Sequence, residues 1–202
     1  MLTKICGITH LADAKLAEKY GAWAIGFNFY KASARYISIH HARLIASQLA
    51  PNLVKVGIFI DACSHDLTQA LSFLDYVQIY QPTTDLSIDK KRIILAVNTD
   101  SHFELPTASV MSEYAFILLD APKAKDGLLG GTGRLACWKL AAQLAKTQKL
   151  ILAGGLNPEN IKQAIAQVNP AGVDVASGIE NHPRSKNTEH MQTFLRSCHE
   201  VN

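Results

Sequence analysis

The sequence predicts an α/β fold in which eight parallel strands alternate with helices, as in a (β/α)8 barrel. Three observations lead to this prediction. Apolar runs of strand length recur eight times along the 202 residues, amphipathic segments with apolar residues three or four positions apart lie between most of them, and no linker or low-complexity tract divides the chain. Such alternation implies a parallel sheet with crossover helices. We therefore expect a single TIM-barrel domain over residues 1–202, close to the lower size limit of that fold.

The expected strands are short apolar runs. Their ranges are Leu2–Cys6, Ala24–Phe29, Leu53–Ile60, Tyr76–Tyr80, Arg92–Val97, Ala115–Leu119, Leu150–Ala153 and Val173–Ala176. The expected helices cover Leu11–Tyr20, His41–Leu49, Leu67–Leu74, Leu135–Ala145 and Pro158–Val168, with a short one within Thr83–Lys90. Asn157, Pro158 and Glu159 form an N-cap, a proline at the first helical position and an acidic first turn, which predicts a helix start after the seventh strand.

A doubly wound open sheet is the alternative architecture. Residues Gly131–Ala136 match the pattern G-x-G-x-x-A that opens dinucleotide-binding helices. In that fold the pattern directly follows the first strand, whereas here a long loop separates it from a strand that ends at Leu119. The match is therefore interpreted as a coincidence, and the barrel is preferred.

The composition limits the classes of function. With 48% hydrophobic residues the chain can bury one sizeable core, and we expect neither a membrane span nor a secretory leader. The net charge of +3 is spread without a long basic run, so a small anion is a better expected partner than nucleic acid. The four cysteines lack the spacing of a metal site or a disulfide framework. We expect a cytoplasmic protein without metal.

Cys6 is the first candidate catalytic residue. It ends the first expected strand and precedes Gly7. Active sites of (β/α)8 barrels lie at the carboxyl ends of the strands, so this thiol is expected to face a shared pocket. The competing interpretation is a buried cysteine that acts as a small hydrophobic residue.

Asp120 follows the sixth expected strand and is expected at the same end of the barrel. A thiolate and a carboxylic acid can divide a proton transfer between them, provided that their environments move the two pKa values apart. The alternative role for Asp120 is a helix cap or a solvated loop carboxylate. Arg35, after the second strand, is a candidate to bind a substrate carboxylate through both ends of its guanidinium, or else an ordinary surface arginine.

Two glycine-containing loops follow the seventh and eighth strands and carry Gly154, Gly155, Ser177 and Gly178. In these barrels the two loops often bind phosphate, because glycines allow backbone N–H groups to approach the oxygens and a helix N-terminus adds a positive dipole. The alternative is that the glycines only permit tight turns. Their position after those two strands predicts a phosphate site.

These residues belong to a longer series of motifs, and with that series the sequence resembles phosphoribosylanthranilate isomerase, a barrel enzyme of tryptophan biosynthesis. The matching segments are Lys4–Thr9, Gly21–Ala22, Ile25–Phe27, Ser33–Arg35, Val56–Phe59, Leu118–Asp120, Gly130–Gly133, Leu152–Leu156 and Gly172–Glu180. Their order spans nearly the whole chain, which makes the resemblance specific.

The resemblance implies an Amadori rearrangement of N-(5-phosphoribosyl)anthranilate without metal or organic cofactor. Asp120 would protonate the furanose ring oxygen and Cys6 would remove the C2 proton. Arg35 would face the anthranilate carboxylate and Asp174 the substrate hydroxyls, while the glycine loops would bind the phosphate. The expected partner is thus a small phosphorylated substrate, and the protein is expected to be a monomer or a homodimer, without nucleic-acid or membrane partners.

The chain departs from the family pattern in three places. Tyr80 stands where the family has His at the end of the fourth strand, Trp23 replaces the Asp of Gly-Ala-Asp, and Arg184–Asn187 replaces Gly-x-Lys-Asp. We expect Tyr80 to line the pocket mouth and to contribute to substrate binding rather than to proton transfer. The other two changes are expected to be structural. Two further functions remain open: a barrel that binds a phosphorylated metabolite without turnover, and an isomerase of another aminoaldose phosphate.

Overall fold

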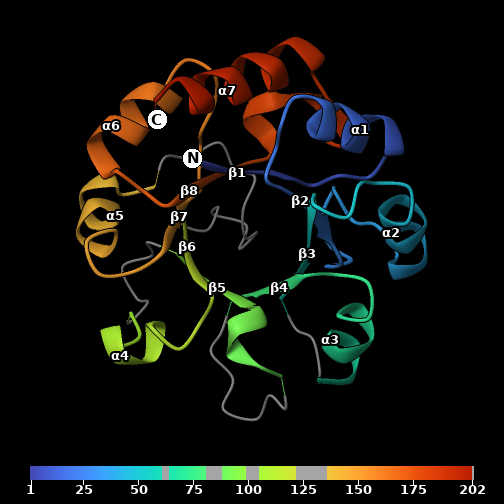
Figure 1. Cartoon of the computed structure of the whole chain (residues 1–202), viewed down its shortest axis with the longest axis horizontal. Helices are drawn as coiled ribbons and strands as arrows, with labels where there is room; N and C mark the ends of the chain where they lie inside the picture. The colour runs from blue at the N-terminus through green and yellow to red at the C-terminus, as the bar shows by residue number, and fades with distance from the viewer. Residues whose placement is uncertain (61–63, 81–87, 99–104, 122–135, 202) are drawn as a thin grey trace.

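A computed structural model describes residues 1–60, 64–80, 88–98, 105–121 and 136–201. Its centre is a closed barrel of eight parallel strands that pair in chain order, with β8 returning to β1 (Figure 1). The strands are β1 Leu2–Cys6, β2 Ala24–Asn28, β3 Val54–Phe59, β4 Tyr76–Ile79, β5 Ile93–Asn98, β6 Phe116–Asp120, β7 Leu150–Leu152 and β8 Gly172–Val175. The predicted (β/α)8 barrel is confirmed, and each predicted strand is present within two residues at either end.

Helices surround the barrel on its outside (Figure 1). They are α1 Leu11–Lys19, α2 Ile39–Ala46, α3 Ser64–Ala70, α4 Ala108–Met111, α5 Trp138–Leu144, α6 Ile161–Val168 and α7 Thr188–Glu200, with the 3₁₀ turns η1 Lys90–Arg92 and η2 Ser177–Ile179. Most of the expected short helix within Thr83–Lys90 and nearly all of the G-x-G-x-x-A pattern lie outside the described residues. The hairpin formed by β9 Glu180–His182 and β10 Ser185–Lys186 has no counterpart in the sequence prediction.

The start of α6 differs from its prediction. The regular helix begins at Ile161, three residues after Pro158. The side chain of Asn157 nevertheless accepts hydrogen bonds from the backbone N–H groups of Glu159 and Asn160, at 3.0 and 2.9 Å. Asn157 therefore caps a preceding turn, and the capping signal lies one turn before the helix proper.

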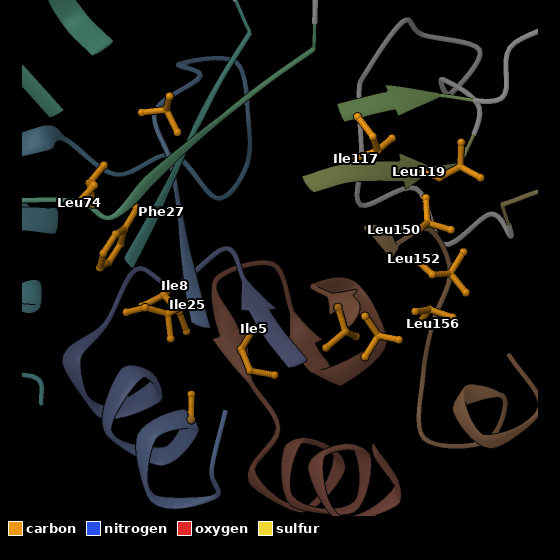
Figure 2. Packing of buried hydrophobic residues seen from close by; sticks show 14 of the residues in the cluster. Ile5, Ile8, Ile25, Phe27, Leu74, Ile117, Leu119, Leu150, Leu152 and Leu156 are labelled. Atoms are coloured by element: carbon orange, nitrogen blue, oxygen red, sulfur yellow. The ribbon is translucent and has the colours of Figure 1, made fainter. Parts of the chain in front are cut away.

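The larger hydrophobic core lies between the barrel and its helices. Because side chains alternate across a strand, Ile5, Ile25 and Phe27 face outward from β1 and β2 and are fully buried. Figure 2 shows two groups of this layer, Ile5 with Ile8 and Ile25 beside the helices, and Ile117, Leu119, Leu150 and Leu152 along neighbouring strands. This layer fixes each strand against its helix.

The second core fills the inside of the barrel. Its buried members are Ala24, Val56, Ile94, Ala96, Leu118, Ile151 and Ala153. At the amino end of the barrel Trp23, Tyr76 and Phe116 pack against it, with ring centroids 5.4 Å apart for Trp23 and Phe116 and 6.0 Å apart for Tyr76 and Phe116. We call these three residues the amino-end aromatic cluster. Trp23 belongs to it, so the departure from the family pattern at this position is structural.

Polar residues occupy the opposite, carboxyl end of the barrel, where Gln78, Asn98, Asp120 and Asp174 are all buried. No helix in the described part of the chain is both long and apolar enough to cross a membrane.

Candidate active site

A pocket opens at the carboxyl end of the barrel. Its lining includes nearly all of the residues that the sequence singled out: Cys6, Arg35, Tyr80, Asp120, Gly154, Gly155, Asp174 and Ser177. Gly178 lies outside the lining. Strand ends far apart in the sequence thus meet at one place because the barrel is closed.

Cys6 shares the interior face of β1 with Lys4, since residues two apart in a strand point the same way. A Cβ atom on Gly26 would lie 3.1 Å from the Cys6 sulfur and 3.2 Å from the Lys4 Cε, so the absence of a side chain at Gly26 leaves the space that these two occupy. Lys4 is fully buried, and its Nζ donates a 2.8 Å hydrogen bond to Asp174 Oδ1.

This environment keeps Cys6 protonated in the unliganded pocket. Burial raises the pKa of the Cys6 thiol above its ordinary value of 9.0, and the negative charge of Asp174 adds to the increase. The ammonium groups of Lys4 and Lys186 act in the opposite direction but do not cancel it. Burial would lower the pKa of Lys4 itself, yet Asp174 and Cys6 hold that pKa above its ordinary value. Lys4 therefore stays charged beside the thiol.

Asp120 is the last residue of β6 and is 7% exposed. Its Oδ1 accepts the backbone N–H of Ala121 at 2.8 Å, and its Oδ2 accepts the hydroxyl of Tyr80 at 3.4 Å. Burial raises the pKa of the Asp120 carboxyl to about 6, although both hydrogen bonds oppose the increase. A carboxyl with this pKa can hold and release a proton near neutral pH, unlike a solvated one.

Tyr80 lines the pocket, as expected, and also contacts Asp120. Burial and the neighbouring Asp120 carboxylate raise the pKa of Tyr80 well above its ordinary value, so its hydroxyl remains a neutral donor. Gln78, two residues earlier on β4, donates to the same hydroxyl at 3.5 Å. The Gln78 Oε1 is buried and has no hydrogen-bond partner among the described residues. Gln78 was missed in the sequence, although its place two residues before Tyr80 on one strand is the signal for a shared face.

Arg35 reaches the pocket but already has a protein partner. Its Nε donates to both carboxylate oxygens of Glu180, at 3.0 and 3.1 Å, and its Nη2 donates to Oε2 at 2.6 Å. Glu180 also accepts a hydrogen bond from Lys186 at 2.8 Å. Glu180 and Lys186 were not predicted as site residues, although Glu180 ends a motif segment and Lys186 keeps the lysine of the family's Gly-x-Lys-Asp stretch.

The loops after β7 and β8 face each other. Gly154 and Gly155 have φ angles of 81° and 66°, which favour glycine. The backbone N–H groups of Gly155 and Ser177 donate to no acceptor within the described residues, and both residues line the pocket. At Gly178 a Cβ atom would lie 1.9 Å from the carbonyl oxygen of Leu156. The absence of a side chain at Gly178 therefore allows the loops after β7 and β8 to pack against each other.

Comparison with known proteins identifies the family. Residues 3–197 match the family model described as N-(5'phosphoribosyl)anthranilate (PRA) isomerase. The chain belongs to the N-(5'-phosphoribosyl)anthranilate isomerase family. Isomerases of this name from Pelobacter propionicus and Listeria innocua are 39% and 36% identical to it; the alignments cover 98% of this chain and 95% and 98% of the relatives.

Solved structures of this isomerase family agree in fold. The phosphoribosyl anthranilate isomerase of Thermotoga maritima has a TM-score of 0.81 and 33% sequence identity over 99% of both chains. A structure of such an isomerase in complex with reduced 1-(o-carboxyphenylamino)-1-deoxyribulose 5-phosphate has a TM-score of 0.79 and 31% identity, again over 99% of both chains.

The departure at residues 184–187 from the pattern of this isomerase family is compatible with the fold. Arg184 stands where the family has Gly and adopts a φ of 77°, a conformation in which an L-residue is strained. Asn187 replaces Asp but accepts the backbone N–H of His190 at 2.9 Å and caps α7, which Asn does as well as Asp. Both substitutions therefore preserve the local structure.

Proposed function

We propose that this chain isomerises N-(5-phosphoribosyl)anthranilate to 1-(2-carboxyphenylamino)-1-deoxyribulose 5-phosphate in tryptophan biosynthesis. The observation that carries the proposal is the meeting of Cys6 and Asp120 in one pocket of a chain from this family. Their environments differ, since one side chain has a thiol with a raised pKa and the other a carboxyl that titrates near 6. A redox-neutral aldose–ketose rearrangement needs one acid and one base, and this pair supplies them.

In the proposed reaction Asp120 donates its proton to the furanose ring oxygen, and the bond between that oxygen and C1 breaks. The nitrogen lone pair forms a double bond to C1 as the ring opens. Cys6, as the thiolate, then removes the proton from C2, and the electron pair of the C–H bond forms the enolamine. Tautomerisation of the enolamine gives the ketose. Every electron shift is balanced by a proton transfer, so the scheme needs no metal or organic cofactor.

The protonation states of the free pocket constrain this mechanism. With the pKa of Asp120 at about 6 and that of Cys6 above 9.0, the dominant form at neutral pH has an ionised Asp120 and a protonated Cys6. The reactive form has the opposite arrangement, and the separation of the two pKa values makes it a small fraction of the molecules. Its fraction is constant between the two pKa values. We therefore expect kcat/KM to be flat from about pH 6 to above pH 9 and to fall on both sides.

Binding roles follow from the lining of the pocket. We assign the phosphate to Gly154, Gly155, Ser177 and Gly178, with the free N–H groups of Gly155 and Ser177 as donors and Gly178, beside the lining, allowing the two loops to pack together. Arg35 faces the anthranilate carboxylate, and Tyr80 lies beside the anthranilate ring. Asp174 and the unpartnered Oε1 of Gln78 are acceptors for substrate hydroxyls.

The test is an isomerase assay with freshly generated N-(5-phosphoribosyl)anthranilate, followed by the loss of its anthranilate-type fluorescence. Protein-dependent loss is the expected result, and inorganic phosphate should compete with the substrate. Binding of the reduced product analogue without turnover would instead select the metabolite-binding barrel. Activity restricted to a different aminoaldose phosphate would select the third function that the sequence left open.

We further propose that the whole chain acts as one domain in the cytoplasm, as a monomer or a homodimer. One related structure is described as monomers generated from the dimeric isomerase of Thermotoga maritima. Size-exclusion chromatography with light scattering at micromolar concentration decides between the two states of this chain.

A further inference from the structure

We propose that Glu180 and Lys186 are positioning residues that hold Arg35 by one edge of its guanidinium and present the other edge to the substrate carboxylate. The inference rests on the proposed function, because it concerns how that substrate is recognised. It extends the site to the β9–β10 hairpin, in which Lys186 pairs with Glu180 across the two strands.

The first observation is the geometry of the Arg35–Glu180 pair. The three hydrogen bonds between them use only the Nε and Nη2 atoms of Arg35. The Nη1 atom has no acceptor among the described residues, although the arginine side chain is only 13% exposed and lines the pocket. A guanidinium has two edges suited to a carboxylate, and Glu180 occupies the Nε edge. The edge formed by Nη1 and Nη2 is left for a second carboxylate.

The second observation is the packing of the Arg35 side chain on Gly7. Gly7 has a φ of 75°, and a Cβ atom there would lie 2.5 Å from Arg35 Cδ. The arginine therefore crosses directly over the residue that follows Cys6. With its aliphatic part against Gly7 and its Nε edge on Glu180, the guanidinium has a fixed orientation above the end of β1.

The third observation is the position of Lys186. Its side chain is fully buried, and its Nζ donates to Glu180 Oε1 at 2.8 Å, to the backbone oxygen of Cys6 at 2.6 Å and to that of Ala176 at 3.1 Å. Three acceptors satisfy the three N–H donors of an ammonium group. Lys186 thus fixes Glu180 relative to the ends of β1 and β8.

The charges explain why two residues are needed. Glu180 alone would neutralise Arg35, and the pair would attract a carboxylate only weakly. Lys186 adds a second positive charge beside Glu180, so the negative charge of Glu180 is shared between two cations and does not neutralise Arg35 alone. Glu180 is ionised, since hydrogen bonds from Arg35 and Lys186 lower its pKa despite the opposing effect of burial. The cluster therefore combines a fixed arginine with a glutamate whose charge is shared with Lys186.

A charge-conserving double replacement, Glu180→Gln with Lys186→Met, tests the positioning. It removes one negative and one positive charge, so the net charge of the cluster is unchanged while the bidentate ionic contact with Arg35 is lost. Replacement of a buried ion pair by neutral residues of similar volume is usually tolerated by the fold. The probe is reduced 1-(o-carboxyphenylamino)-1-deoxyribulose 5-phosphate, and its Kd is measured by calorimetry with Arg35 present and in an Arg35→Met background.

We expect the double replacement to weaken binding of this probe about tenfold when Arg35 is present and less than about twofold when Arg35 is Met. In the isomerase assay KM should rise when Arg35 is present, and kcat should also fall because Lys186 no longer lowers the pKa of Cys6. Equal weakening in both backgrounds would overturn the proposal, because the pair would then act on the pocket as a whole. Unchanged affinity with Arg35 present would overturn it as well.

A measurement on the wild-type protein tests the same proposal without a variant that could fail to fold. The Arg35 Nε–H resonance in a ¹⁵N-labelled sample should keep its position when the probe saturates the site, because Glu180 retains that edge, and an Nη resonance should shift instead. Displacement of the Nε–H signal would show that the ligand replaces Glu180 and would contradict the proposal. Failure of the probe to bind the wild type would also contradict it, whereas the proposed function is decided separately by the isomerase assay.

Discussion

The two ends of the barrel are built from the same strands but have opposite chemistry. On β4 the interior residues run from Tyr76 at the amino end through Gln78 to Tyr80 just beyond the carboxyl end, and on β6 they run from Phe116 to Asp120. Aromatic rings fill the amino end, whereas buried charges and amides surround the pocket at the other. The alternation of side chains thus lets a single strand contribute to stability at its start and to chemistry at its end.

The difference has an energetic reason. The buried pair of Lys4 and Asp174 and the carboxyl of Asp120 lose hydration when the protein folds, and a buried ion pair contributes little net stability. Edge-to-face aromatic packing stabilises the fold without such a penalty. We therefore expect mutations at the amino end to change stability and mutations at the carboxyl end to change turnover.

Asp120→Asn should have the largest effect on activity. Loss of the general acid is expected to lower kcat by about 10²–10⁴, measured in the isomerase assay. Stability should not fall at neutral pH: the folded-state pKa of about 6 lies above the ordinary value of 3.8, so the ionised carboxylate destabilises the fold as the pH rises through this interval. Glu113→Gln, an exposed carboxylate on the outside, is the control. A variant with normal kcat and a lower melting temperature would make Asp120 a structural residue.

Trp23→Ala tests the amino end. The change removes the ring that packs on Tyr76 and Phe116, and we expect a loss of about 2–3 kcal/mol in the free energy of unfolding, measured with urea. The kcat of the folded fraction should remain within about twofold of wild type because the pocket lies at the other end. A large fall in kcat with unchanged stability would mean that the two ends are not separate in function.

Arg184→Gly should stabilise the protein. Arg184 has a φ of 77°, and glycine adopts this conformation without the penalty of about 1 kcal/mol that an L-residue carries. The variant also loses the hydrogen bond from Arg184 to the backbone oxygen of Tyr36, which reduces the gain in stability. Asn169→Gly is the matched control, because Asn169 has a φ of 50° at the end of α6. Asparagine tolerates this region better than arginine, so the control should gain less stability. A lower melting temperature for Arg184→Gly would disprove the strain.

Tyr80→Phe should have the smallest effect. The hydroxyl donates to Asp120 and favours its ionised form, so its removal should raise the pKa of Asp120 further. The lower limb of the pH profile of kcat/KM is then expected to move upward by less than about one unit, because the hydrogen bond is long. At the plateau kcat should stay within a few-fold of wild type, while Tyr80→Ala mainly raises KM. A collapse of kcat in Tyr80→Phe would show that the hydroxyl takes part in the chemical step.

The sequence predicted the barrel and the candidates at strand ends because these depend on local patterns. Cys6 and Asp120 each end an apolar run, and the closed barrel then brings them together. The Tyr80–Asp120 contact was not predictable in the same way, since it joins β4 to β6 across the barrel and depends on how far each side chain extends into it.

The Arg35–Glu180–Lys186 cluster was missed for a different reason. It depends on a hairpin whose strands have three and two residues, too short for any periodic pattern. The helix α7 was also left out, although its buried Met191, Phe194, Leu195 and Cys198 follow helical spacing. The β9–β10 hairpin therefore contributes to this site, whereas α7 contributes to the core.

Cys6→Ala tests the central claim most directly, namely that the chemistry at the carboxyl end depends on one thiol that the fold does not need. The measurement is kcat of the purified variant, with the urea midpoint determined on the same sample. We expect kcat to fall by at least about 10²–10⁴ because the base is lost, while the midpoint changes little because only one small side chain is truncated. Near wild-type kcat would contradict the account and make Cys6 a packing residue of the barrel interior.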